Sequence, residues 1–164
     1  MMSKSVLLDT SFFITLLDSK RANHSVAKQY LRYFLENKFV LWLSSIVVSE
    51  YCHKGTLDEP PMAHLYVLPF TLEHAVESAA LDFKSRPEDN ARRDTAKDDY
   101  KLLAQAKCER AGFLMTDDVN SLAAYARNLV EEGKLDLRCI SLGDGFDVAL
   151  VNEDQQRELP ESEA

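Results

Sequence analysis

The stretch VLLDTSFFITLL, residues 6–17, decides the fold class of this chain. Its first three residues are apolar and uninterrupted, which predicts a buried strand over residues 6–8. The apolar residues of 12–17 then follow helical spacing and predict a helix, which Ser11 is expected to cap. A buried strand that leads at once into an apolar helix is typical of an α/β domain. Asp9 lies at the junction of the two elements.

The same alternation of short apolar runs and helical patterns continues along the chain. Further strands are expected at residues 39–43, 64–70, 113–115 and 137–141, and further helices at residues 22–37, 44–54, 71–83, 95–110 and 119–132. Ser44 or Ser45 is expected to cap the helix at 44–54, and Thr95 with Asp98 forms a predicted capping box. The polar stretch 84–93 is predicted to be a loop. The pattern predicts one α/β domain with a parallel sheet.

Length and composition agree with a single folded domain. The chain has 164 residues, of which 46% are hydrophobic, and a formal net charge of -8. Half of that charge falls in residues 153–164, which carry five acidic residues and one arginine. We expect a domain over residues 1–152 and an acidic, disordered tail over residues 153–164. The acidic balance on its own counts against a nucleic-acid partner.

Cysteine usage and hydropathy predict a cytoplasmic protein. The three cysteines have no metal or disulfide spacing, which is typical of free thiols in a reducing compartment. The start of the sequence does not resemble a signal peptide, because Asp9 interrupts its apolar run after three residues. No apolar run approaches the length of a membrane span, and no membrane partner is expected.

Acidic residues fall where an α/β sheet forms its ligand crevice. Asp9 and the pair Asp117 and Asp118 directly follow predicted strands, whose carboxyl ends share one edge of the sheet. Glu50 and the pair Asp98 and Asp99 lie on predicted helices, and we expect an α/β fold to bring them toward the same edge. Four or more carboxylates there require compensation, and Mg²⁺ or Mn²⁺ prefers oxygen ligands. Such ions support displacement at phosphorus, so the cluster indicates phosphodiester chemistry.

Each acid also has a purely structural interpretation. Asp118 fits a helix cap, Asp98 a capping-box partner, and Asp99 a first-turn residue favoured by the helix dipole. Asp9 and Glu50 are harder to explain in this way, because both lie among apolar residues where an unpaired carboxylate is costly.

Four stretches resemble the PIN-domain nucleases, a family that includes the VapC-type toxins of toxin–antitoxin systems. They are VLLDTSFFITLL around Asp9, LSSIVVSEY around Glu50, KDDYKLLAQAK around Asp99, and FLMTDD ending at Asp118. They occur in the family's order and together cover about residues 5–141. The resemblance implies a three-layer α/β/α sandwich with a central, mainly parallel sheet. It also implies a Mg²⁺- or Mn²⁺-dependent endoribonuclease, with a small antitoxin and a second copy of the chain as partners.

The resemblance assigns Asp9, Glu50, Asp99 and Asp118 to the catalytic, metal-binding acids. The doublets leave Asp98 and Asp117 as alternative metal ligands at two of these positions. Ser11 and Thr116 are expected to orient carboxylates or water through their hydroxyl groups.

Basic residues offer a route for RNA beside this acidic cluster. Residues 20–38 carry a local net charge of +4 and residues 92–110 one of +2. The candidate RNA contacts are Lys20, Arg21, Lys28, Arg32, Arg92 and Arg93. An ordinary solvated helix face explains either stretch equally well.

Two rival functions remain open at this point. The first is a non-catalytic module of the same fold that binds RNA or protein. The second is a response-regulator-like phosphoacceptor, in which acids at strand ends also hold Mg²⁺. It is disfavoured, because Glu50 on a helix has no role in such a domain and no lysine follows a late strand at the required place.

Overall fold

The computed structural model describes residues 2–53, 62–82 and 90–152, apart from the side chains of residues 62, 82 and 90–95. Five strands form one parallel sheet in the order β3-β2-β1-β4-β5. The strands are β1 (Ser5–Leu8), β2 (Val40–Ser44), β3 (Tyr66–Leu68), β4 (Phe113–Thr116) and β5 (Arg138–Ser141). Leu8 is paired with Leu43 on one side and Met115 on the other, so the carboxyl ends of β1, β2 and β4 coincide.

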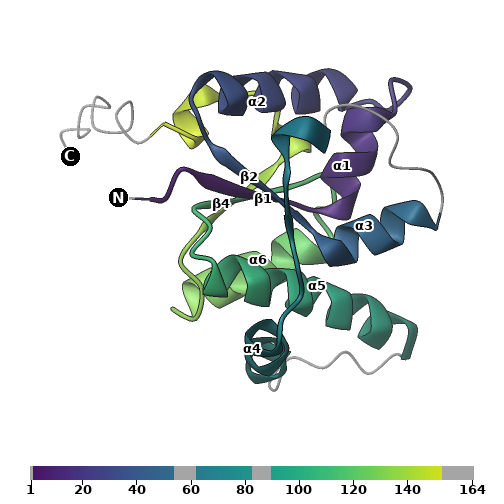
Figure 1. Ribbon diagram of the computed structural model, residues 1–164, viewed down its shortest axis with the longest axis vertical. Coiled ribbons are helices and arrows are strands. Elements are labelled where there is room, and N and C mark those ends of the chain that lie inside the picture. Colours follow the sequence, from purple (N-terminus) through teal and green to yellow (C-terminus); the bar gives the residue numbers. More distant parts are fainter. Residues whose placement is uncertain (1, 54–61, 83–89, 153–164) are drawn as a thin grey trace, which may run out of the picture.

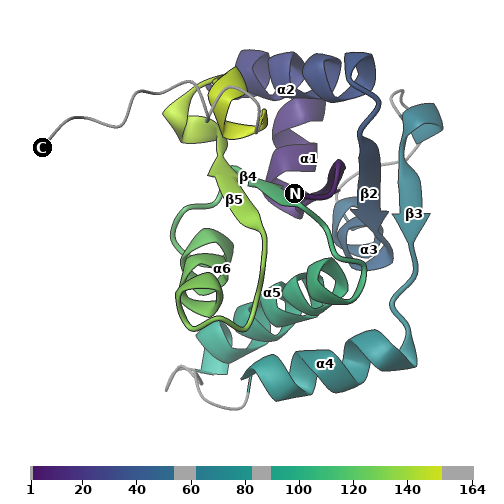
Figure 2. The ribbon, with the colours of Figure 1, turned by 90° about the vertical axis from the view of Figure 1, so that its left-hand side faces the viewer.

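Within these described residues, six helices complete the α/β/α sandwich that the family resemblance implied (Figures 1 and 2). They are α1 (Thr10–Leu17), α2 (His24–Glu36), α3 (Ser45–Cys52), α4 (Leu72–Asp82), α5 (Asn90–Cys108) and α6 (Leu122–Glu131). The pair α1 and α2 lies on one side of the sheet, while α4, α5 and α6 lie on the other. Short 3-10 turns cover Met62–His64, Leu142–Asp144 and Val148–Leu150. Helix α3 packs against α1 and β2.

The core explains why the central strands read as unbroken apolar runs. All four residues of β1 and all four of β4 are buried, since helices cover both faces of a parallel sheet. On α2, the buried residues Ala27, Tyr30 and Phe34 follow helical spacing. None of the described helices is long and apolar enough to cross a membrane.

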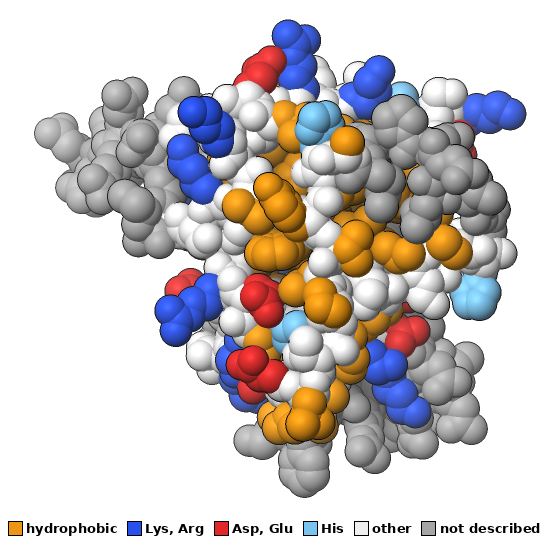
Figure 3. Space-filling view, viewed as in Figure 1, with side chains coloured by type: hydrophobic (Ala, Val, Ile, Leu, Met, Phe, Trp, Pro, Cys, Tyr) orange, Lys and Arg blue, Asp and Glu red, His pale blue; other side chains and the backbone are white. Residues whose placement is uncertain are grey.

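Edge strand β3 and helix α4 present an apolar surface to solvent. Pro69 follows β3 directly, and because proline cannot donate to a neighbouring strand, its place beside an edge strand is expected. Tyr66, Val67, Leu72 and Val76 are between 52% and 81% exposed. Figure 3 shows hydrophobic side chains gathered in a stripe down this face of the molecule.

Several element boundaries differ from the sequence-based expectations. Asp9 rather than Ser11 caps α1, because its carboxylate accepts the N–H of Phe12 at 2.7 Å. Ser44 caps α3, one of the two predicted residues. Helix α6 begins at Leu122 rather than 119, since the preceding turn is closed by the Asp118 carboxylate.

Helix α5 starts earlier than the sequence suggested. It begins at Asn90, so the predicted loop is wrong for residues 90–93 and the capping box of Thr95 and Asp98 does not start the helix. A polar stretch without glycine or proline can be helical when it continues into a packed segment, and Ala96 and Tyr100 are both buried. The expectations for residues 54–61 and 83–89 and for the tail at 153–164 lie outside the described residues.

Gly112 should be intolerant of a side chain. Its N–H donates to Ser5 O at 3.0 Å and its carbonyl accepts from Arg138 N at 2.9 Å, so the backbone is fixed on both sides. A Cβ atom there would lie 2.0 Å from the backbone oxygen of Ser3. We expect Gly112→Ala to lower the free energy of unfolding in urea by about 1–3 kcal/mol. Gly143→Ala is the matched control because a Cβ there has no neighbour within 4 Å; equal stability of the two variants would contradict this account of the packing.

Candidate active site

A single pocket at the carboxyl edge of the sheet brings together the four acids that the sequence singled out. Asp9 enters from the end of β1 and Asp118 from the segment after β4, while Glu50 comes from α3 and Asp99 from α5. The pocket has a volume of about 420 Å³. Its remaining lining residues are Thr10, Ser11, Ile14, Arg21, Asp98, Leu102 and Leu122.

Asp9 is the most deeply buried of these acids, at 3% exposure. Its Oδ1 accepts hydrogen bonds from Phe12 N at 2.7 Å and Ser11 Oγ at 2.9 Å, and its Oδ2 accepts one from Thr116 Oγ1 at 2.5 Å. Burial nevertheless raises the pKa of Asp9 to about 6, against the lowering effect of these bonds, and the charge of Asp118 adds to the rise. Asp9 is therefore both a helix cap and a wall of the pocket.

Asp99 carries the one buried carboxylate oxygen without a hydrogen-bond partner in the described part of the chain. This atom is its Oδ2. Burial raises the pKa of Asp99 to about 7; the Ser121 hydroxyl lowers it, and the charges of Asp118, Asp9 and Glu50 raise it. The four acids thus interact electrostatically across the pocket.

Glu50 and Asp118 are held by neighbouring donors. The hydroxyl of Thr10 donates to Glu50 Oε2, which joins α1 to α3. Asp118 accepts the N–H groups of Asn120 and Ser121 on Oδ1 and the Ser121 hydroxyl on Oδ2, at 3.0, 3.3 and 2.7 Å. Asp118 therefore stabilises the turn before α6, but it is not the predicted helix cap, because Ser121 occupies the N-cap position. Its side chain also lines the pocket. Thr10 was not among the predicted residues, and its position directly after Asp9 was the only signal for it.

The two aspartate doublets have distinct environments. Asp117 does not line the pocket, because Thr15 Oγ1 at 2.7 Å and Asn23 Nδ2 at 2.8 Å donate to its carboxylate. Asp98 lines the pocket but also forms an ion pair with Lys101 at 3.1 Å. The geometry thus favours Asp118 over Asp117 and Asp99 over Asp98 as the acids available to a ligand.

The hydroxyls of Ser11 and Thr116 connect the two strand ends. Each donates to the Asp9 carboxylate. Ser11 Oγ also accepts the N–H of Asp117 at 2.8 Å, and Thr116 Oγ1 accepts that of Asp118 at 2.9 Å. The two residues therefore orient Asp9 and the backbone that carries Asp118.

The donor set is compatible with a hard divalent cation. Among the described residues, no three His, Cys, Asp or Glu side chains are grouped closely enough to enclose a metal. Mg²⁺ does not need such a cage, since proteins usually hold it through one or two carboxylates with water in the other positions. The polar lining is rich in oxygen donors, and the unpartnered Oδ2 of Asp99 is a free ligand atom. The residues therefore fit a water-coordinated Mg²⁺ or Mn²⁺, with Asp9, Glu50, Asp99 and Asp118 as the candidate holders.

The predicted basic stretch divides between two surfaces. Arg21 lines the carboxylate pocket, where it makes no ion pair within the described residues, and Lys20 is exposed beside it in sequence. Lys28 and Arg32 instead line a separate depression on α2 of about 400 Å³, where Arg32 forms an ion pair with Glu36 at 2.8 Å. The side chains of Arg92 and Arg93 lie outside the described residues.

Comparison with known proteins identifies the fold. The sequence matches no protein-family model and no curated protein. Similar solved structures include VapBC2 from Rickettsia felis bound to a promoter DNA fragment (TM-score 0.55, 15% identity, 84% of this chain and 99% of that chain). DNA-bound VapBC from Salmonella typhimurium has a TM-score of 0.51 at 19% identity, with 87% and 99% of the two chains covered. VapC20 of Mycobacterium tuberculosis, a sarcin–ricin loop cleaving toxin, has a TM-score of 0.51 at 17% identity, with 73% and 94% covered. The five-stranded sheet and its helices thus form the PIN-like α/β fold.

The raised pKa values of Asp9 and Asp99 predict how the stability of the metal-free protein depends on pH. A carboxyl whose pKa is raised on folding binds its proton more tightly in the folded state than in the unfolded chain. The resulting stabilisation is complete below the ordinary pKa of 3.8 and is lost as the pH rises through about 6 for Asp9 and about 7 for Asp99. We therefore expect these groups to make the protein less stable at pH 8 than at pH 5.

Asp99→Asn should reduce this loss of stability, because it removes one of the two titrating carboxyls. The expected reduction is about 1–2 kcal/mol, since water screens a carboxyl that is only partly buried. The measurement is urea unfolding at pH 5 and pH 8 in the presence of EDTA. Asp98→Asn is the matched control, since it removes the neighbouring surface carboxylate that pairs with Lys101. An unchanged pH dependence in Asp99→Asn would show that Asp99 does not carry the effect.

Proposed function

We propose that this protein is a Mg²⁺- or Mn²⁺-dependent nuclease that hydrolyses phosphodiester bonds in RNA. The observation that carries the proposal is the pocket shared by Asp9, Glu50, Asp99 and Asp118, in which the Asp99 Oδ2 is buried without a partner. Buried polar atoms are normally satisfied, so an exception in a pocket indicates an atom reserved for a ligand. Mutual repulsion of the carboxylates favours a cation as that ligand.

The choice of RNA as substrate rests on fold similarity. VapC20, one of the similar structures, is a toxin that cleaves the sarcin–ricin loop, and it shares the fold at 17% identity. This likeness supports an endoribonuclease and, with the VapBC complexes, a toxin that pairs with a small antitoxin. The expected homodimer and the cytoplasmic location stay predictions.

The chain's own residues supply three parts of the proposed reaction. Asp9 is held rigid by three donors and fixes one side of the cation site. Asp99, Glu50 and Asp118 complete the negative wall, and Arg21 provides a cation for a phosphate oxygen at the same pocket. The bound ion would neutralise charge on the phosphate and lower the pKa of a coordinated water. The apolar side chains of Ile14, Leu102 and Leu122 contribute a nonpolar part of the wall.

The two rivals fare differently. A response-regulator-like domain has the sheet order 2-1-3-4-5, whereas this sheet has the order 3-2-1-4-5. A non-catalytic module of the same fold remains the alternative, and saturable Mn²⁺ binding without turnover of RNA would favour it.

Asp99→Asn should lower the rate of RNA cleavage in Mg²⁺ or Mn²⁺ by about 10²-fold or more. The reason is that it removes a negative charge from the proposed cation site, where the Oδ2 of Asp99 has no hydrogen-bond partner. The assay follows labelled RNA cut by wild type and by variants, with EDTA in parallel reactions. Glu132→Gln serves as the control and should cleave at the wild-type rate, because it removes a carboxylate that lies outside the pocket and pairs with Lys134. Cleavage that persists in EDTA, or full activity in Asp99→Asn, would refute the metal-dependent mechanism.

Arg21→Ala should weaken RNA binding, because this guanidinium lines the carboxylate pocket without an acidic partner in the described chain. The slope of the logarithm of the binding constant against the logarithm of the salt concentration should become smaller in magnitude by about 0.7. This is the value for one phosphate contact on a single strand. Arg32→Ala is the control, since it removes the same charge from the depression on α2. Binding to RNA measured across a salt series tests the difference; equal slopes in the two variants would rule out a specific contact by Arg21.

A further inference from the structure

Gln105 is a fully buried polar residue on the helix that carries Asp99. It is 0% exposed, while its neighbours Leu103, Ala104 and Ala106 are apolar. Asp98, Leu102, Gln105 and Glu109 follow one another at helical spacing and therefore share a face of α5. The first two line the carboxylate pocket, and Gln105 follows them on the same face, away from the pocket lining.

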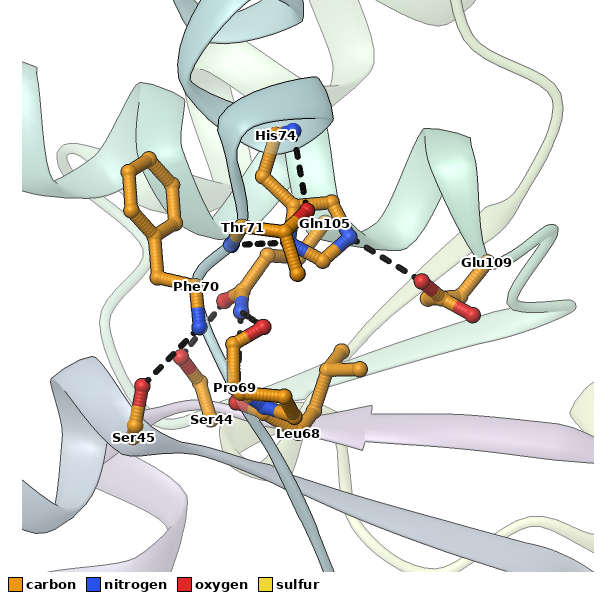
Figure 4. Close-up of polar contacts among 9 residues, drawn as sticks. All are labelled: Ser44, Ser45, Leu68, Pro69, Phe70, Thr71, His74, Gln105 and Glu109. Carbon is orange, nitrogen blue, oxygen red and sulfur yellow. Dashed lines mark hydrogen bonds and ion pairs between the residues drawn. The ribbon is translucent and has the colours of Figure 1, made fainter.

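The backbone dictates the orientation of the Gln105 amide. The carbonyls of Leu68 and Pro69 can only accept, so Nε2 donates to them, at 3.4 and 3.3 Å. Oε1 must then accept from the Ser44 hydroxyl, at 2.5 Å. Figure 4 shows Gln105 meeting these three partners where β2 and β3 end.

Ser44 transmits this bond to the helix that carries Glu50. Its side chain is 0% exposed, and its Oγ accepts the N–H of Ile46 at 3.1 Å as the cap of α3. The hydroxyl hydrogen is committed to Gln105, and the oxygen to the first turn of α3. The position of that turn is therefore coupled to α5 through the buried Ser44–Gln105 bond. The N–H of Phe70, which follows Pro69, donates to Ser45 Oγ at the same turn, at 3.2 Å.

We propose that Gln105 is a positioning residue that sets α3 against α5 and so fixes Glu50 relative to Asp99. Glu50 lies six residues after Ser44, and Asp99 lies six residues before Gln105. Six helical residues span about 9 Å, so the two carboxylates stand at equal distances along their helices from the Ser44–Gln105 bond. This inference rests on the proposed function, because the geometry it fixes is that of the cation site.

A second polar branch on α5 serves α4 instead. Thr71 and His74 cap α4 reciprocally, and because His74 Nδ1 accepts the N–H of Thr71, Nε2 carries the hydrogen that reaches Glu109 Oε1 at 3.0 Å. His74 is 1% exposed, so loss of Glu109 leaves a buried donor unsatisfied (Figure 4). This branch lies on the same face of α5 but has no bond to α3, which makes it a matched control for stability.

Gln105→Leu should weaken Mn²⁺ binding by about 10–100-fold, as expected for loss of a bond that orients a metal-binding carboxylate. Ser44→Ala removes the other partner of the same bond and should weaken it similarly. Because both changes break the same Ser44–Gln105 bond, the loss of Mn²⁺ affinity in the double variant should be smaller than the sum of the losses in the two single variants. Binding is measured by calorimetry on the metal-free proteins, with urea unfolding of each variant in EDTA.

Glu109→Ala should lower the free energy of unfolding while leaving Mn²⁺ affinity at the wild-type value. Equal weakening of Mn²⁺ binding by Glu109→Ala and Gln105→Leu would overturn the positioning role. It would show that the loss of affinity comes from lower folding stability and not from the Ser44–Gln105 bond. If the wild type binds Mn²⁺ and cleaves RNA but Gln105→Leu has the same Mn²⁺ affinity, the positioning role would be overturned and the proposed function would stand. Failure of the wild type to bind Mn²⁺ would overturn the proposed function, and this inference with it.

Discussion

The structure depends on burying one carboxylate at the junction of β1 and α1. Asp9 is 3% exposed, and a buried carboxylate is tolerated only when it is hydrogen-bonded or bound to a cation. Its partners are the first turn of α1 and the hydroxyl of Thr116 at the end of β4. The same hydroxyl accepts the N–H of Asp118, so satisfying Asp9 also fixes the backbone of a second acid. This set of bonds joins the ends of β1 and β4, which are more than 100 positions apart, and so fixes one wall of the pocket.

Much of the fold could be predicted because its strands are buried on both faces. Residues 6–8 and 113–115 read as unbroken apolar runs, and both proved to lie in the centre of the sheet. The cap of α1 could not be predicted, since Asp9 and Ser11 are both good capping residues. A tertiary contact decides between them, because the Ser11 oxygen already accepts the N–H of Asp117, which follows the carboxyl end of β4. The early start of α5 was missed for a related reason, because its polar first turns continue into a helix whose stability comes from packing.

The site was foreseeable in its chemistry and less so in its details. The sequence predicts Asp9 and Asp118 at one edge of the sheet, since parallel strands share their carboxyl edge. The choice within each doublet depends on partners that are remote in sequence, as Thr15 and Asn23 show for Asp117. The basic stretch divided for the same kind of reason: the chain bends between α1 and α2, which leaves Arg21 at the pocket and Arg32 on the outside of α2. Sequence proximity alone cannot separate two arginines on either side of such a bend.

These contacts also determine at which acid a substitution can test activity without disturbing the fold. Asp9 is the most prominent acid in the sequence, but replacing it would disturb the α1 cap, the bond to Thr116 and the pocket together. A loss of activity there would not separate folding from catalysis. Asp99 differs, because its Oδ2 makes no hydrogen bond and an amide can occupy the same space. Burial disfavours its charge, as do the charges of Asp118, Asp9 and Glu50, so neutralising it should stabilise the metal-free fold near neutral pH. A residue that costs stability in the absence of a ligand is retained most simply for what it binds, and this opposition between stability and binding is the strongest physical argument that the pocket is functional.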